Sequence, residues 1–239
     1  NKGDYFMRYL LLAITIALTI TFIIVRVLKG GIWGLFTKTT ASLAFVALGL
    51  VGAYKHGLTM VASFILLGLL FGMLGDIVLD LKKIYKNDEK PYLNAGMLSF
   101  GLGHIMYMIA TILYSNSLFK YDIKTLYLVM IGVGIGGIIT IFIACFGEKL
   151  LKLNFGKFRY QTYAYTFILS FMSAFSVAVA CYKPIFLVFA LGIVFIFLSD
   201  LILSKQYFGG EHDNNVLTIL NHAIYYAGQI AIAFSLFFI

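Results

Sequence analysis

Continuous apolar runs, each about as long as a bilayer is thick, constrain this chain more than any other feature. A helix needs roughly 20 mainly apolar residues to cross the hydrocarbon core of a membrane. Eight such runs are present, at residues 9–28, 39–54, 58–81, 92–115, 123–146, 160–181, 184–204 and 215–238. Because the runs are continuous rather than alternating, helices satisfy the backbone in lipid better than a β-barrel would. The sequence therefore predicts an all-α, polytopic membrane protein with eight transmembrane helices.

The composition and the short connections support one membrane-embedded domain over residues 1–239. Hydrophobic residues make up 62% of the chain and charged residues 12%, whereas soluble domains are roughly 45–50% apolar. No small-residue cleavage site follows the first run, so no cleavable signal peptide is expected. We interpret the net charge of +8 as a sign of orientation and of contact with anionic lipids, not of nucleic-acid binding. Cys145 and Cys181 lack metal-ligand spacing and are interpreted as small hydrophobic residues.

The positions of the basic residues predict how the chain is oriented in the membrane. Lysine and arginine are enriched in cytoplasmic loops. Twelve of the 18 basic residues belong, in this interpretation, to the loops that follow the first, third, fifth and seventh runs. Those loops are expected in the cytoplasm of a cell-membrane protein, with both termini outside. The twelve are Arg26, Lys29, Lys38, Lys82, Lys83, Lys86, Lys90, Lys149, Lys152, Lys157, Arg159 and Lys205.

Two aspartates interrupt the end of the third apolar run. Gly68, Gly72, Asp76 and Asp80 follow one another at four-residue spacing, so they share one face of a helix. Glycines on that face let a neighbouring helix approach closely, and the acids are expected to point at protein rather than lipid. A charge within a membrane helix costs at least a few kcal/mol, which favours a functional role for Asp76. Asp80, beside two lysines, is also explained as a solvent-facing charge at the helix end.

The seventh run carries a similar pattern, which predicts an internal repeat. The third run ends with Gly75-Asp76-Ile-Val-Leu-Asp80 and the seventh with Ser199-Asp200-Leu-Ile-Leu-Ser204. The run after each contains a His-x-x-Tyr motif, beginning at His104 and at His222. Runs one to four and five to eight are therefore predicted to form two parallel four-helix repeats, related by an axis along the membrane normal. The glycines of the fifth run are interpreted as a close-packing seam; they are Gly132, Gly134, Gly136 and Gly137.

In the predicted orientation, most polar side chains of the runs fall in the cytoplasmic half of the membrane. The rise of about 1.5 Å per residue places His104 and Gln229 near the midplane. We therefore predict one pocket open to the cytoplasmic leaflet, with Asp76 and Asp200 as its strongest functional candidates. The candidate substrate-binding residues are Asp80, Asn94, His104, Tyr165, His222, Tyr225 and Gln229. Asp76 and Asp200 are alternatively explained as structural acids bonded to a neighbouring helix, and Asp80 as a charge at the helix end. Packing or hydrogen bonding between helices is the alternative for His104, His222, Tyr225 and Gln229.

A metal ion and a cofactor are not expected. Two histidines and a carboxylate suit zinc, so a site made of His104, His222 and an aspartate is geometrically possible. The different depths of the two histidines count against it. The sequence also lacks the Gly-x-Ser-x-Gly, His-Glu-x-x-His and Walker patterns, and a serine hydrolase therefore has no signature here.

Several of these motifs together resemble the YhhN family of eight-span membrane proteins, which includes the lysoplasmalogenases. The resemblance is carried by the segments 68–71, 74–79, 100–107, 197–203 and 225–229. It implies hydrolysis of the vinyl ether bond of a lysoplasmalogen to a fatty aldehyde and a glycerophospho-ethanolamine or -choline. Such hydrolysis suits one protonated carboxylic acid and one carboxylate, which Asp76 and Asp200 would supply.

The resemblance also implies roles for further side chains. His104, Tyr225 and Gln229 would orient water or hold the polar end of the substrate, and the alkenyl chain would lie among the apolar helices. Lys82, Lys83 and Arg159 would attract the phosphate headgroup, although orientation in the membrane explains these charges equally well.

Two other classes of function are also consistent with the sequence. Intramembrane acids and histidines near a repeat interface are typical of proton relays, so a proton-coupled transporter is the main alternative. Against a transporter, the polar groups gather in one half of the membrane, and no run contains a central proline. A metal-dependent lipid hydrolase and a non-enzymatic lipid-binding or structural protein are the remaining alternatives.

Overall fold

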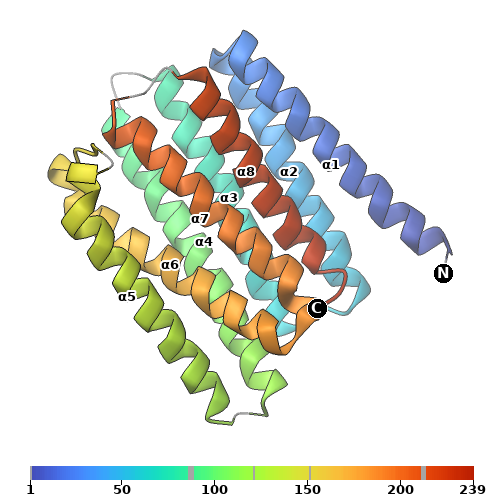
Figure 1. Cartoon of the computed structure of the whole chain (residues 1–239). Helices are drawn as coiled ribbons and strands as arrows, with labels where there is room; N and C mark the ends of the chain where they lie inside the picture. Colours follow the sequence, from blue (N-terminus) through green and yellow to red (C-terminus); the bar gives the residue numbers. More distant parts are fainter. Residues whose placement is uncertain (1, 86–88, 121, 151, 211–213) are drawn as a thin grey trace. The chain divides into compact units, whose positions relative to one another are not determined.

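The computed structural model describes the chain except for residues 1, 86–88, 121, 151 and 211–213 (Figure 1). Eight of the described helices are long and apolar enough to cross a membrane, which confirms the predicted all-α, multi-pass class. They are α1 (Lys2–Leu28), α2 (Gly31–Lys55), α3 (Met60–Ile84), α4 (Glu89–Leu118), α5 (Lys124–Leu150), α6 (Arg159–Tyr182), α7 (Leu187–Phe208) and α8 (Asn215–Ser235). Short 3₁₀ turns, η2 (Gly156–Phe158) and η3 (Pro184–Phe186), precede α6 and α7.

The start of α2 differs most from the prediction, since the helix begins at Gly31 rather than at residue 39. The added segment, residues 31–38, ends with Thr37 and Lys38, and two further threonines, Thr39 and Thr40, follow directly, which lowered the apparent hydropathy around this helix start. Inside the helix, the hydroxyls of Thr37, Thr39 and Thr40 donate to backbone carbonyls of the preceding turn at 2.8, 2.9 and 3.0 Å. Their polar atoms are thus satisfied within the helix, and the polar segment belongs to the span.

The chain divides into two compact units. Unit 1 contains residues 1–110 and 229–239, and unit 2 contains residues 111–228. The boundary between the units falls within α4, after Ala110, and within α8, before Gln229. The single domain and the four-helix repeats both remain predictions.

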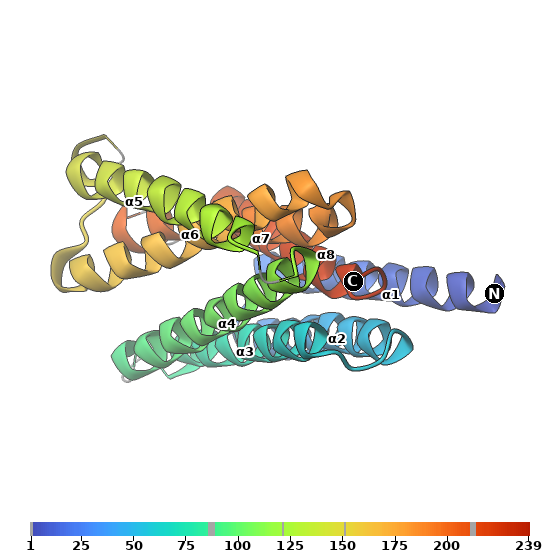
Figure 2. The same ribbon diagram turned by 90° about the horizontal axis from the view of Figure 1, so that it is seen from below.

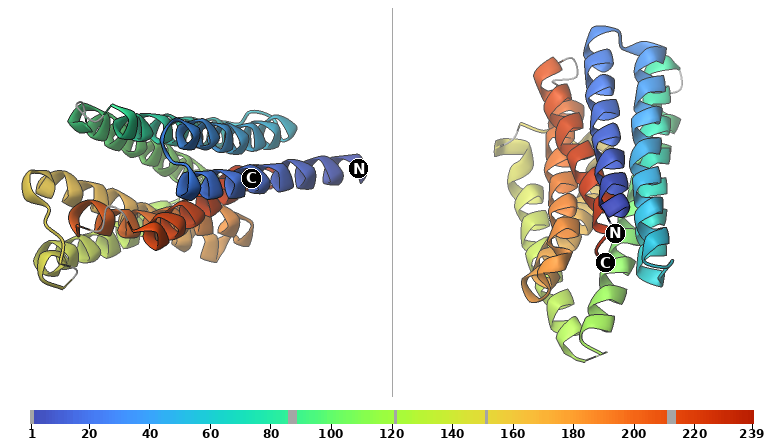
Figure 3. Two further views of the ribbon diagram at one scale, coloured as in Figure 1. Left: turned by 90° about the horizontal axis from the view of Figure 1, so that it is seen from above. Right: turned by 90° about the vertical axis from the view of Figure 1, so that its right-hand side faces the viewer.

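In unit 1, α2 packs between α1 and α3. The antiparallel pair of α1 and α2 is clear on the right of Figure 3, and Figure 2 shows the N-terminal part of α4 beside α3. Gly68 of α3 faces Tyr107 of α4 so closely that a Cβ at Gly68 would overlap the tyrosine ring. A Cβ at Gly103 of α4 would lie 3.1 Å from the carbonyl oxygen of Gly68. This close approach confirms the expectation that the third-run glycines seat a neighbouring helix.

In unit 2, α6 packs against both α5 and α7. Gly132 and Gly136 of α5 lie against Phe171 of α6, and a Cβ at either glycine would come within 2.9 Å of that residue. A Cβ at Gly134 or Gly137 would meet nothing within 4 Å. The predicted seam is therefore confirmed for two of the four glycines and wrong for the other two.

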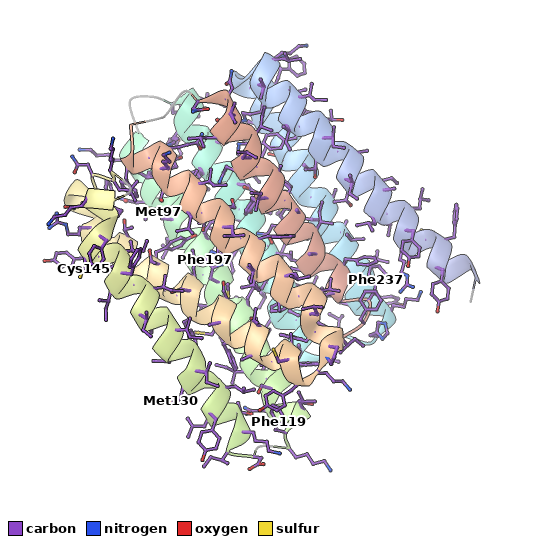
Figure 4. The ribbon with its side chains drawn as sticks, viewed as in Figure 1. Met97, Phe119, Met130, Cys145, Phe197 and Phe237 are labelled. Carbon is purple, nitrogen blue, oxygen red and sulfur yellow. The ribbon has the colours of Figure 1, made fainter. Side chains whose placement is uncertain are left out.

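The outward surface of α5 is apolar. Met130 and Cys145, both labelled in Figure 4, are exposed on this helix. Cys145 and Cys181 are free cysteines, and both are exposed.

The neighbouring glycines Gly136 and Gly137 provide a matched test of the packing of α5 on α6. Gly136→Ala is expected to lower stability by about 1–3 kcal/mol, because the added methyl group must displace the backbone of Phe171. Gly137→Ala is expected to leave stability unchanged or to raise it by up to about 1 kcal/mol, because alanine favours a helix more than glycine. Thermal unfolding in detergent measures both, and equal shifts would contradict the packing.

Candidate functional site

A cluster of four charged side chains is buried among the first three helices. This ionic cluster contains Arg26 of α1, Lys38 of α2, and Asp76 and Asp80 of α3; the four residues are 7%, 3%, 1% and 3% exposed. The Nζ atom of Lys38 lies 3.1 Å from Oδ1 of Asp76 and 3.6 Å from Oδ1 of Asp80. The guanidinium of Arg26 donates a hydrogen bond to Oδ2 of Asp80. Two cations thus face two carboxylates, as buried charges require.

The local sequence of each helix positions one part of the ionic cluster. Asp76 and Asp80 are one turn apart on α3 and therefore face the same neighbour. Ser42, which follows Lys38 by four residues on α2, donates a hydrogen bond to Oδ2 of Asp76 at 2.7 Å. Arg26 lies in the last turn of α1, where a positive charge complements the helix dipole. Both oxygens of Asp76 therefore have a donor on α2.

The expectation that Asp80 is a solvent-facing charge is wrong, because the residue is buried and paired with Arg26. Arg26 and Lys38 were likewise assigned to a cytoplasmic loop, whereas both lie in helices and are buried. A low hydropathy assigns a basic residue to a loop, because the scale does not show whether a carboxylate on another helix is close enough to pair with it. For Lys38, the four-residue spacing to Ser42, which matches that of the two aspartates, is the signal that could have identified it.

A second buried polar group in unit 1 joins α4 to the last turns of α8. The Tyr107 hydroxyl donates to Oε1 of Gln229 at 2.8 Å, and the two residues are at most 1% exposed. His104, one turn before Tyr107, is 2% exposed, and the two rings are 6.4 Å apart between centroids. His104 and Gln229, which the sequence placed at one depth, are thus both buried in unit 1. Tyr107 was not among the predicted site residues.

In unit 2, Asp200 of α7 accepts a hydrogen bond from the Tyr165 hydroxyl of α6, at 2.7 Å. The residue before it, Ser199, is tied to α8 through Asn221, whose amide donates to the Ser199 carbonyl at 2.8 Å. Tyr225 of α8 is 6% exposed, and its ring meets that of Tyr226 edge-on at 5.2 Å. The acid and its tyrosine come from neighbouring helices, whose contact the sequence alone did not show.

The remaining predicted residues are less enclosed. Asn94 of α4 is exposed and His222 of α8 is partly buried. Arg159 is exposed and donates to a carboxylate oxygen of Glu148 at 2.5 Å. Across the described parts of the chain, no three His, Cys, Asp or Glu side chains come together as a ligand set for a metal ion. Asp76 belongs to unit 1 and Asp200 to unit 2, and the single pocket remains a prediction.

These features define a class: a multi-pass α-helical membrane protein that buries paired charges within its spans. A family model described as the YhhN family matches residues 33–236, which is most of the chain. The protein belongs to the YhhN family, as the motifs of its sequence predicted. The match includes Lys38, Ser42, Asp76 and Asp200 and begins after Arg26. No curated protein and no solved structure matches the chain.

Proposed function

We propose that the protein is a membrane hydrolase that cleaves the vinyl ether bond of lysoplasmalogens. The products are a fatty aldehyde and a glycerophospho-ethanolamine or -choline. One observation carries the proposal: a chain of the YhhN family buries Asp76 inside a membrane helix, with a donor for each carboxylate oxygen. Ionisable groups within spans are costly and mark functional sites, and carboxyl groups are what this hydrolysis needs.

The chemistry begins with transfer of a proton to the β-carbon of the vinyl ether. This step forms an oxocarbenium ion, to which water adds at the α-carbon. Loss of a proton gives a hemiacetal, whose carbon–oxygen bond breaks to release the aldehyde and the glycerol hydroxyl. Water is consumed and the proton is returned, so a carboxylic acid and a carboxylate are sufficient for catalysis. We assign these two roles to Asp76 and Asp200.

The other predicted residues fit supporting roles in this proposal. The hydroxyl of Tyr165 donates a hydrogen bond to a carboxylate oxygen of Asp200 and so orients it. His104 and Gln229 provide buried polar atoms among apolar helices. The substrate enters from the bilayer, and its alkenyl chain contacts apolar side chains. Asp80 is better explained as the partner of Arg26 than as a substrate contact.

Aldehyde release by the purified protein tests the proposal. Asp76→Asn and Asp200→Asn are each expected to lower the rate by about 100-fold, which is typical for the loss of an acid or base. Asp122→Asn, the same change at an exposed aspartate, is the control and should retain the wild-type rate. Full aldehyde production by both variants would rule out the carboxylate mechanism.

Loss of activity in chelator would favour the metal-dependent alternative. Proton flux into liposomes without lipid cleavage would favour the transporter.

A further inference from the structure

We propose that Lys38 is a positioning residue that keeps Asp76 ionised, so that Asp76 acts as the carboxylate of the reaction and not as its proton donor. The assignment of a catalytic role rests on the proposed function. The charge state of Asp76 does not depend on it, because it follows from the contacts of the ionic cluster alone.

The first argument is the hydrogen-bonding character of the groups around Asp76. The ammonium of Lys38 has only donors, and it lies 3.1 Å from Oδ1 of Asp76. An ionised carboxylate accepts at both oxygens, so it matches an ammonium at Oδ1 and a donating Ser42 hydroxyl at Oδ2. If Oδ1 were protonated, its hydroxyl group would point at an ammonium that cannot accept a hydrogen bond.

The second argument is the balance of charge in the ionic cluster. An opposite charge within about 4–6 Å favours the ionised form of a carboxyl group. Arg26 binds Oδ2 of Asp80, and Lys38 lies nearer to Asp76 than to Asp80, at 3.1 against 3.6 Å. Each aspartate thus has its own nearest cation, and the four formal charges sum to zero when both aspartates are ionised.

The consequence is a division of roles. A carboxylate fixed between Lys38 and Ser42 can stabilise the positive charge of the oxocarbenium ion or accept a proton from the attacking water. It has no proton to give to the β-carbon. Removing the Lys38 charge would take away the cation that lies 3.1 Å from Asp76, while Arg26 stays on Asp80, and the loss of an opposite charge beside a buried carboxylate favours its protonated form. Asp76 is the one that would take up a proton, because Asp80 keeps Arg26.

Infrared spectroscopy of the protein in lipid vesicles tests the charge state directly, since a protonated carboxylic acid has a carbonyl stretch that a carboxylate lacks. Lys38→Met is expected to gain one such band, and Lys38→Met/Asp76→Asn is expected to lose it again. Lys38→Arg, which keeps the charge, should gain no band. Lys124→Met, at a lysine whose side chain is 60% exposed, should also leave the spectrum unchanged.

The wild-type protein provides a test that does not require Lys38→Met to fold. A protonated-carboxyl band in the wild type that disappears in Asp76→Asn would overturn the proposal. So would a folded Lys38→Met protein without a new band from Asp76. In the aldehyde assay, Lys38→Arg should retain most activity, whereas Lys38→Met should lower kcat at least tenfold with little change in KM. Because the spectra need no substrate, a protein that shows the expected bands but releases no aldehyde contradicts only the proposed function.

Discussion

Arg26→Met is expected to destabilise the folded protein by about 3 kcal/mol, because removing one partner of a buried ion pair leaves the other charge uncompensated. Asp80 would lose the cation that binds its Oδ2, and Lys38, at 3.6 Å from Asp80, lies nearer to Asp76. Thermal or denaturant unfolding in detergent measures the loss. The methionine keeps much of the side-chain volume, so the change reports mainly on charge.

The pair formed by Arg159 and Glu148 provides the matched control. This arginine also binds a carboxylate, but the two side chains are 48% and 40% exposed, and surface ion pairs contribute little to stability. Arg159→Met should therefore unfold close to the wild type. Arg26→Met/Asp80→Asn should recover part of the loss, since it removes the carboxylate left without its partner. Equal losses for Arg26→Met and Arg159→Met would show that the ionic cluster does not stabilise unit 1.

Gly68→Ala has the second large expected effect. The added methyl group would overlap the ring of Tyr107, and overpacking of this kind costs about 1–3 kcal/mol. Displacing the ring would also break the buried hydrogen bond between Tyr107 and Gln229, and the loss of a buried hydrogen bond costs a further amount of about 1 kcal/mol. The expected result is a large fall in the unfolding temperature.

Gly101 of α4 allows a direct comparison, because a Cβ there would meet nothing within 4 Å. Gly101→Ala is therefore expected to be neutral or slightly stabilising. Combining Gly68→Ala with Tyr107→Leu, which removes the ring, should recover part of the packing loss. If Gly68→Ala unfolded like Gly101→Ala, the close seating of α4 on α3 would be incorrect.

The eight spans could be predicted because hydropathy is a property of each segment alone. The start of α2 could not, because Lys38 reads as a loop charge until its partners on α3 are known. For the same reason Asp76 was found and Arg26 was missed: an aspartate inside an apolar run is conspicuous in the sequence, whereas a basic residue near the end of a run resembles an ordinary orientation signal.

The prediction of the site was limited in both units because the sequence does not show which helices are neighbours. Tyr165 was a candidate through its depth, but its contact with Asp200 depends on which helices are neighbours. Asn94 was included because its run begins near the predicted pocket, and the helix turns it outward, where it is exposed. Periodicity assigns a residue to a face of its own helix, and it does not identify the helix that covers that face.

The ionic cluster also has a consequence for how the protein is made. Arg26, Lys38 and Asp76 come from three successive helices, and each such charge costs about 2.5–3.5 kcal/mol at the centre of a lone inserting helix. Lys38 of α2 and Asp76 of α3 lie 3.1 Å apart in the folded protein, so the cost of both charges falls when the two helices meet. We therefore expect α1, α2 and α3 to leave the insertion machinery together, as one group that is already paired when it reaches the lipid.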